Sequence, residues 1–311
     1  MVRTVLGDIL PADLGHTQCH EHIFLEKSAS FHINPALCMD SIPRSLQELQ
    51  EFRAAGGQTL VDAQPGGYGR NAQALAQLSR ESGIYIVSVA GFHKKQFFES
   101  FCDLPDLTVS QLTDRFVHEI CSGMLQPDGT PTTIRAGMLK GAFEPDGLTD
   151  PVYLRLFTAV VEAAALTGAP VMIHTEPNDD IFSLIRFFED RGVPSRKLMI
   201  CHLDRTHYDA DYHRQVLEQG CYLCYDSVHR LKYVSQEQEL ALIRAIVDAG
   251  FDRQVVLSLD TTNQRLRSYN ATDMGLDYIL TDFIPALQEA GFSDLSIQRM
   301  CRLNAQSILN F

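Results

Sequence analysis

Residues 170–204 read PVMIHTEPNDDIFSLIRFFEDRGVPSRKLMICHLD and hold the unit that decides the fold. Two short apolar runs, Pro170–Glu176 and Lys197–Asp204, have the length and composition of buried strands. The segment Asp180–Arg191 between them has the apolar spacing of a helix. A strand, a helix and a second strand in this order predict two parallel strands joined by a crossover helix.

The same alternation extends over nearly the whole chain. Further strands are expected at Thr17–Leu25, Thr59–Pro65, Ile84–Phe92, Arg135–Phe143, Tyr222–Val228 and Gln254–Asp260. Further helices are expected at Ser41–Ala55, Asn71–Ser82, Val109–Met124, Pro151–Leu166, Asp209–Glu218, Gln236–Ala249 and Tyr278–Ala290, with a terminal helix at Asp294–Leu309. Eight strands alternating with eight helices predict an α/β fold, a closed (β/α)8 TIM barrel with its active site at the carboxyl ends of the strands.

An open, doubly wound sheet is the alternative architecture. It would need a glycine-rich phosphate turn or a similar feature at a switch point, and the nearest cluster, Gly66-Gly67-Tyr68-Gly69, lacks the spacing of a dinucleotide fingerprint. No linker, low-complexity segment or longer repeat interrupts the pattern. A single domain over residues 1–311 is therefore expected.

The composition limits the classes of partner. Of the 311 residues 45% are hydrophobic, which is ample for one large core. With 26 basic and 39 acidic residues the net charge is −13, which disfavours nucleic acids and anionic membranes as partners. Neither a signal peptide nor a run of roughly 20 apolar residues is found. We expect a cytoplasmic protein, and a homodimer remains open.

The eight cysteines are expected to be free thiols of a reducing compartment. Cys221 and Cys224 form a C-x-x-C pair inside an apparent strand. Positions three apart on a strand face opposite sides, so this pair is poorly placed to clasp one metal ion.

A histidine pair, His20 and His22, is the strongest local signal for chemistry. Residues two apart on a strand point the same way, so both imidazoles share one face and Glu21 lies on the other. Two imidazoles in register suit a metal ion, because neutral imidazole is a common ligand of borderline metals. Taken alone, the pair is also compatible with ordinary polar positions on a strand.

Three more strands end in residues that bind metals. His174, His202 and Asp260 each close an apolar run. Any one of them could simply be the polar position where a strand reaches solvent. Because the carboxyl ends of barrel strands converge on one face, their joint occurrence with the histidine pair indicates a metal site.

Lys140 lies within the apolar stretch 136–141, where burial should lower the pKa of its amine. A neutral amine reacts with carbon dioxide to give a carbamate, an anion whose two oxygens suit a pair of metal ions. The alternative is a lysine paired with a buried carboxylate such as Asp260. The residues alone do not separate these two interpretations.

Taken in order, these segments resemble the phosphotriesterase-related family of the amidohydrolase superfamily. The resemblance spans nearly the whole chain and rests on His20-Glu21-His22, Lys140, His174-Thr175, His202-Leu203-Asp204-Arg205-Thr206, Ser258-Leu259-Asp260, Gly69-Arg70-Asn71-Ala72-Gln73 and Asp277-Tyr278-Ile279-Leu280-Thr281. It implies a hydrolase with two divalent metal ions, zinc first and manganese or cobalt as alternatives. By resemblance, one ion is held by His20, His22 and Asp260, the other by His174 and His202, and both are bridged by a hydroxide and carbamylated Lys140.

The resemblance also implies a mechanism without a covalent intermediate. The hydroxide attacks a carbonyl or phosphoryl group, and Asp260 accepts its proton and passes it to the leaving group. A lactone or carboxylic ester is the first expectation for the substrate, and a phosphotriester or an amide the second. Lactonase-type relatives often place a Tyr after the third strand, where this chain has Gly91-Phe92-His93-Lys94-Lys95.

Two other function classes are compatible with a metal-binding barrel. A phosphodiesterase or nuclease is disfavoured by the net charge of −13 and by the absence of a long basic strip. A non-enzymatic binding protein is disfavoured because all six candidate ligand positions are occupied by suitable residues.

Three loops at the expected active face reverse the overall acidic charge. The segments 227–236 and 261–272 carry basic residues and no acid, and the loop after the third strand adds His93, Lys94 and Lys95. We therefore expect an anionic small-molecule substrate, phosphorylated or carboxylated, contacted by His93, Arg230, Lys232, Arg265 and Arg267. The alternative is that these side chains are solvated or pair with acids of neighbouring loops.

Overall fold

The computed structural model describes residues 1–98 and 102–311. Within them eight parallel strands follow one another in chain order, each hydrogen-bonded to the next, and form a barrel. The strands are β3 (His16–Glu21), β4 (Gly57–Asp62), β5 (Tyr85–Gly91), β6 (Met138–Ala142), β7 (Val171–His174), β8 (Leu198–Cys201), β9 (Tyr222–Tyr225) and β10 (Val255–Leu257). This order confirms the (β/α)8 barrel and excludes the doubly wound sheet, whose strand order reverses at a switch point.

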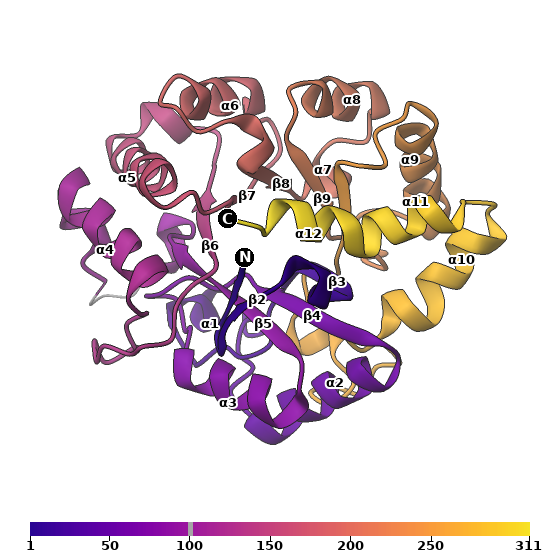
Figure 1. Ribbon diagram of the computed structural model, residues 1–311, viewed down its shortest axis with the longest axis horizontal. Coiled ribbons are helices and arrows are strands. Elements are labelled where there is room, and N and C mark those ends of the chain that lie inside the picture. Colours follow the sequence, from indigo (N-terminus) through magenta and orange to yellow (C-terminus); the bar gives the residue numbers. More distant parts are fainter. Residues whose placement is uncertain (99–101) are drawn as a thin grey trace.

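The helices surround the strands (Figure 1). They are α1 (Ala29–Ile33), α2 (Ile42–Ala54), α3 (Ala72–Ser82), α4 (Val109–Cys121), α5 (Pro151–Thr167), α6 (Ile181–Glu189), α7 (Leu203–Thr206), α8 (Ala210–Glu218), α9 (Gln236–Asp248), α10 (Ile284–Glu289), α11 (Asp294–Gln298) and α12 (Asn304–Ile308). Two expected helices contain π-helical turns, η7 (Ile279–Phe283) and η8 (Arg299–Leu303). Several strands end earlier than predicted, because the backbone leaves the ladder before the site residues, with left-handed φ angles at His202 and Asp260.

An N-terminal hairpin was not among the predicted elements. Its strands are β1 (Val2–Thr4) and β2 (Gly7–Ile9), which pair antiparallel. Val2 packs with Ile308 of α12 in the apolar cluster that fills the barrel. The Arg3 carbonyl lies against Gly137, just before β6, where a side chain would clash with it. The hairpin and α12 therefore cap the end of the barrel opposite the strand carboxyl ends, and the two termini meet there (Figure 1).

The barrel closes between its first and last strands through side chains as well as backbone. The Asp260 amide donates to the His20 carbonyl at 3.0 Å, and the His20 amide donates to Ser258 Oγ at 2.8 Å. The Glu21 carboxylate, on the face opposite the imidazoles, accepts from the Leu259 amide at 2.7 Å. These contacts join β3 to the segment after β10 and fix His20 beside Asp260.

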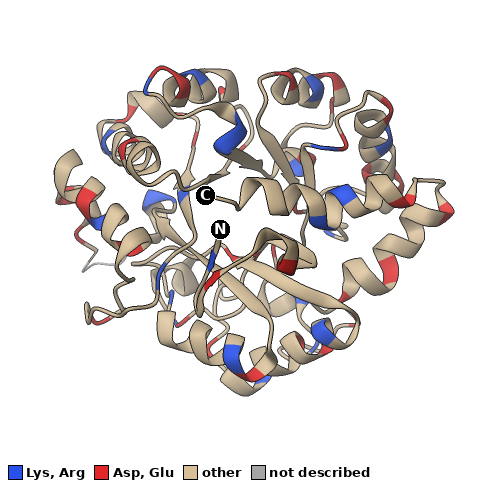
Figure 2. Ribbon diagram, viewed as in Figure 1, with Lys and Arg blue, Asp and Glu red and all other residues tan. Residues whose placement is uncertain are grey.

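The apolar core has two layers, one inside the barrel and one between strands and helices. Cys224 belongs to the inner layer and Cys221 to the outer one, as the spacing on a strand predicts. All eight cysteines are free thiols, which confirms the prediction. Charged residues of both signs are scattered over the outer helices (Figure 2). Throughout residues 1–98 and 102–311, no helix combines the length and the apolar character that crossing a membrane requires.

A buried ion pair fixes the loop after β4 against α4. The Arg70 guanidinium donates to both carboxylate oxygens of Glu119, at 2.7 and 2.9 Å, and to the carbonyls of Val89 and Leu125. Arg70 is 1% exposed, so its charge has no access to bulk water. The glycine cluster before it leads directly into this buried ion pair.

Glu119→Gln should destabilise the metal-free protein by about 3–5 kcal/mol, because it leaves the buried Arg70 charge without its counterion. The matched control is Asp103→Asn, which breaks the exposed pair with Arg115 and should cost less than about 1 kcal/mol. Urea unfolding followed by circular dichroism measures both. Equal losses in the two variants would contradict the assigned role of burial.

Candidate metal centre

The first candidate group of ligands forms where β3 meets the segment after β10. His20 and His22 point the same way from the end of β3, and both lie close to Asp260 Oδ1, with Nε2 distances of 3.7 and 3.4 Å. All three side chains are buried. Asp260 adopts a left-handed backbone conformation with φ of 48°, an uncommon strain for a non-glycine residue that aims its carboxylate at the two imidazoles.

The second group comes from the ends of β7 and β8. His174 Nδ1 lies 2.7 Å from His202 Nε2, so one nitrogen of each ring faces the other. His202 also has a left-handed backbone, with φ of 73°. The His20 and His202 rings are 4.8 Å apart between centroids, which makes the two groups one continuous cluster.

At His20, burial is outweighed by the neighbouring Cys201 and Asp226, which raise the pKa of that imidazole to about 10. At the other three, burial decides the protonation: it lowers the pKa of His22 and of His174 to about 4, and that of His202 well below its usual range. These three imidazoles are therefore neutral at physiological pH, which is the form that binds metal ions. A buried group of neutral imidazoles with one carboxylate fits divalent metal ions. His22 faces Asp260 with Nε2, and its other ring nitrogen, Nδ1, has no hydrogen-bond partner among the described residues.

Lys140, on β6, is fully buried and donates from Nζ to the Ala63 carbonyl at 2.7 Å. Burial lowers the pKa of its amine to about 8. Among the described residues its amine forms no ion pair with Asp260, whose carboxylate instead binds Arg205 and Arg230. The structure therefore shows no Lys140–Asp260 ion pair, and an amine whose pKa has fallen to about 8 gives up its proton more readily than an ordinary lysine, as carbamate formation requires.

Two arginines converge on Asp260, and only Arg230 was expected near the site. Arg205 Nη1 lies 2.7 Å and Arg230 Nη2 3.0 Å from Asp260 Oδ2. Burial alone would raise the pKa of Asp260, but the charges of Arg230 and Arg205 outweigh it and hold that pKa well below its usual range. Arg205 lies in the short helix α7 and not at the end of a strand, so a search for polar residues at strand ends could not identify it.

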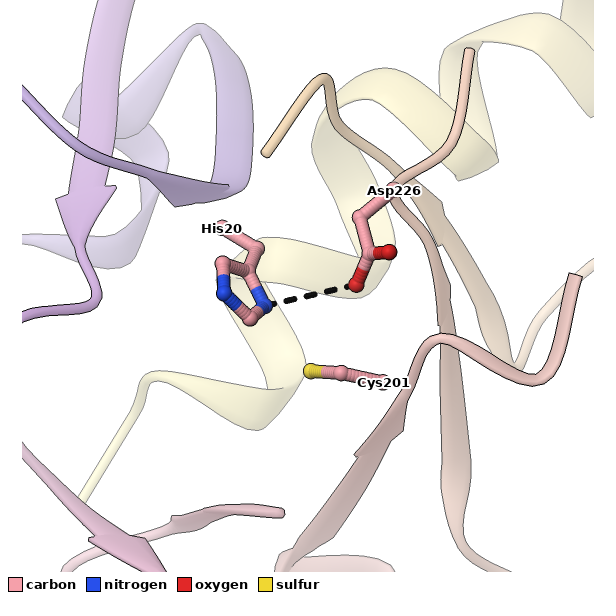
Figure 3. Close-up of side chains that lie close together, drawn as sticks. All are labelled: His20, Cys201 and Asp226. Carbon is pink, nitrogen blue, oxygen red and sulfur yellow. Dashed lines mark ion pairs between the residues drawn. The ribbon is translucent and has the colours of Figure 1, made fainter. Parts of the chain in front are cut away.

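Asp226 is a second residue that sequence reasoning missed. It follows β9 directly, is fully buried, and lies beside His20 (Figure 3). Its Oδ1 is 2.6 Å from His202 Nδ1, and its Oδ2 is 3.3 Å from His20 Nδ1. The rule that found Asp260, an acidic residue closing an apolar strand, would have found Asp226 had the seventh strand been predicted to end at Tyr225 rather than Val228.

The expected substrate contacts divide into two sets. The His93 ring lies 5.2 Å from the His174 ring, and Arg230 contacts Asp260, so the structure brings both to the cluster. Arg265 instead donates to the backbone, to the carbonyls of Leu259 and Val228.

The remaining cations are directed elsewhere. Arg267 binds Glu51 and Asp277, each at 2.9 Å, and the Lys232 amine lies over the Tyr233 ring at 4.5 Å. Lys94 and Lys95 pair with the carboxylates of Glu176 and Asp150. The alternative of pairing with neighbouring acids therefore holds for Lys94, Lys95 and Arg267.

Comparisons with known proteins agree with this geometry. The phosphotriesterase family matches residues 1–309. A phospho-furanose lactonase of Mycoplasmopsis synoviae is 27% identical over 99% of this chain and 91% of its own, and an N-acetyltaurine hydrolase of Xenopus tropicalis is 27% identical over 100% and 98%. The crystal structure of a lactonase from Listeria monocytogenes superposes with a TM-score of 0.91 at 29% identity, covering 100% of this chain and 99% of that one.

Lys140→Met should stabilise the metal-free protein at neutral pH, by about 1–3 kcal/mol, because it removes a buried amine whose charged form is disfavoured. The folded-state pKa of about 8 lies below the ordinary 10.5, so the destabilisation by Lys140 is fully present below about pH 8 and vanishes as pH rises through 10.5. Unfolding of both proteins between pH 7 and 10 measures the difference. A variant less stable than wild type at pH 7 would contradict this account.

Proposed function

The chain belongs to the phosphotriesterase family and is a metal-dependent hydrolase, and on that premise we propose that it is a binuclear enzyme that cleaves a lactone or carboxylic ester bearing an anionic group. One observation carries the proposal: four buried imidazoles, one carboxylate and one lysine amine gather from the ends of four strands and the middle of a fifth. We propose that the ligands are His20, His22, Lys140, His174, His202 and Asp260.

Two divalent ions at this site would lower the pKa of a shared water and polarise the oxygen of the scissile carbonyl. The residues then have distinct tasks. The imidazoles would supply nitrogen lone pairs, and Lys140, as a carbamate, would supply two oxygens between the two groups of ligands. Zinc is the first choice of metal, with manganese and cobalt as alternatives, because mixed nitrogen and carboxylate donors accept several borderline ions.

Asp260 is the proposed proton carrier. Its Oδ1 faces the imidazoles of His20 and His22, and its Oδ2 is held by Arg205 and Arg230. The two guanidinium groups fix the orientation of this carboxylate, so that Oδ1 would be placed to take a proton from the attacking water and pass it to the leaving oxygen.

The anionic character of the substrate is proposed from Arg230. The Arg230 side chain is 9% exposed and lies at the cluster. Its guanidinium has three N–H donors beyond the two that Asp260 uses. A phosphorylated sugar lactone is the first candidate substrate, in keeping with the phospho-furanose lactonase relative. An amide with an acidic tail is the second, because the relative named as an N-acetyltaurine hydrolase cleaves an amide that carries a sulfonate.

Metal removal and Lys140 substitution test the centre itself. Chelation should abolish hydrolysis of a lactone and ester panel, and zinc, manganese or cobalt should restore it. Lys140→Ala should lose bound metal and activity, and propionate should partly restore both by replacing the carbamate oxygens. Metal content by plasma emission spectrometry is the measurement. Full metal occupancy and activity in Lys140→Ala without propionate would contradict the bridging role.

Matched anionic and neutral substrates test the role of Arg230. Arg230→Ala should raise KM for the anionic substrate by roughly tenfold or more, the loss of a charge-assisted hydrogen bond of about 1.5–3 kcal/mol, and leave KM for the neutral analogue nearly unchanged. Arg267→Ala is the control, since Arg267 is bound by Glu51 and Asp277 and should affect neither. If Arg230 only positions Asp260, kcat will fall equally for both substrates, and the anion proposal fails.

A further inference from the structure

Asp226 lies behind two imidazole nitrogens that turn away from the candidate metal positions. His202 uses Nε2 toward His174 and Nδ1 toward Asp226. His20 uses Nε2 toward Asp260 and Nδ1 toward Asp226. The Asp226 carboxylate thus contacts one histidine from each ligand group. The two histidines come from β3 and from the end of β8, 182 residues apart in the chain.

We propose that Asp226 is the positioning residue shared by both metal positions, setting the tautomer and ring orientation of His20 and His202 at once. The inference rests on the proposed binuclear site and goes beyond it, because Asp226 is not among the proposed ligands. It acts through the two imidazoles.

The chemistry of a neutral imidazole explains how a carboxylate on one ring nitrogen affects metal binding at the other. A neutral ring carries one proton, and whichever nitrogen holds that proton cannot bind a metal. A carboxylate that accepts from Nδ1–H keeps the proton there and leaves the Nε2 lone pair free. The same hydrogen bond fixes the ring about its χ2 axis and makes Nε2 a stronger donor.

The geometry of Asp226 fits this task. One of its oxygens is hydrogen-bonded to His202 Nδ1 at 2.6 Å. The other lies 3.3 Å from His20 Nδ1, an ion-pair contact without hydrogen-bond geometry, and the side chain is 0% exposed. A buried carboxylate with one oxygen toward each ring is placed to accept an Nδ1–H from either one.

The other rings differ in a way that provides a comparison. His174 Nε2 lies 2.9 Å from Glu176 Oε1, and Glu176 in turn pairs with Lys94, so this carboxylate serves a single ring. His22 Nδ1 has no hydrogen-bond partner within residues 1–98 and 102–311. Loss of Asp226 should therefore disturb both ions, whereas loss of Glu176 should disturb only the one held by His174 and His202.

The alternative to the positioning role is a site for a soft metal ion in the same space. Cys201 lies beside His20 and Asp226 (Figure 3), and one atom from each of the three residues falls within 4.8 Å of the others. Such an ion would make Asp226 a ligand and not a positioning residue. The short hydrogen-bond distance between Asp226 and His202 favours the positioning role, and the experiment separates the two.

The first measurement is zinc affinity of the metal-free protein, by competition with a chromophoric chelator. Asp226→Asn should weaken both zinc constants by roughly 10–100-fold, the usual effect of removing such a carboxylate. Glu176→Gln should weaken one constant. Asp252→Asn is the control, because Asp252 is a buried acid that pairs with Arg299 away from the cluster, and it should leave both unchanged. Wild-type affinity at either position in Asp226→Asn would overturn the proposal.

The second measurement needs no metal. In metal-free protein labelled with ¹⁵N-histidine, the His202 ring should carry its proton on Nδ1, with a strongly downfield N–H resonance, and Asp226→Asn should lose that resonance while Glu176→Gln keeps it. Retention of the Nδ1–H tautomer in Asp226→Asn would overturn the proposal even if the variant were less stable. Should Asp226→Asn fail to fold, Asp226→Glu keeps the charge, displaces it by one methylene, and should show an intermediate loss of affinity at both positions.

Two further variants separate failure of this inference from failure of the proposed function. If His20→Ala and His202→Ala bind two zinc ions as wild type does, the binuclear site itself is wrong. If they lose zinc but Asp226→Asn does not, only the positioning role is wrong. A cadmium ion lost specifically in Cys201→Ser would identify the soft-metal site and likewise overturn the positioning role.

Discussion

The seam between β3 and β10 is the constraint on which the candidate site depends. Residues separated by 238 positions in the chain meet there, with the His20 amide donating to Ser258 Oγ and the Asp260 amide to the His20 carbonyl. Glu21 reinforces the seam from the opposite face by accepting from the Leu259 amide. Because residues in a strand alternate between faces, one tripeptide both closes the barrel with its glutamate and presents two imidazoles to the interior.

Burial then decides the chemistry. A charge inside this barrel must be paired or neutralised, and the structure uses both solutions. The imidazoles of His22 and His174 are neutral, and Lys140 has a weakened affinity for its proton. Asp226 and Asp260 instead remain ionised, because each is held by cationic or hydrogen-bonding neighbours. Neutral donors and fixed carboxylates in one cluster are the combination that divalent metal ions require.

Much of the fold and of the ligand set was predictable from local sequence. Apolar runs of strand length alternating with amphipathic helices specify a parallel barrel, and His174, His202 and Asp260 stand where those runs end. Asp226 was missed because the apolar pattern of β9 continues to Val228 although the ladder stops at Tyr225. Arg267 was expected at the substrate, but its partner Glu51 belongs to α2, which no local pattern brings beside the loop after β10.

The sequence by itself determined which residues could bind metal, because residue type and position on a strand are local properties. Only the tertiary structure decided how those residues are protonated and oriented. Asp260 is held by one arginine from α7 and one from the loop after β9, and His20 and His202 both contact the carboxylate that follows β9. These contacts join segments far apart in the chain, and their strength comes from a buried environment that exists only when the barrel is closed.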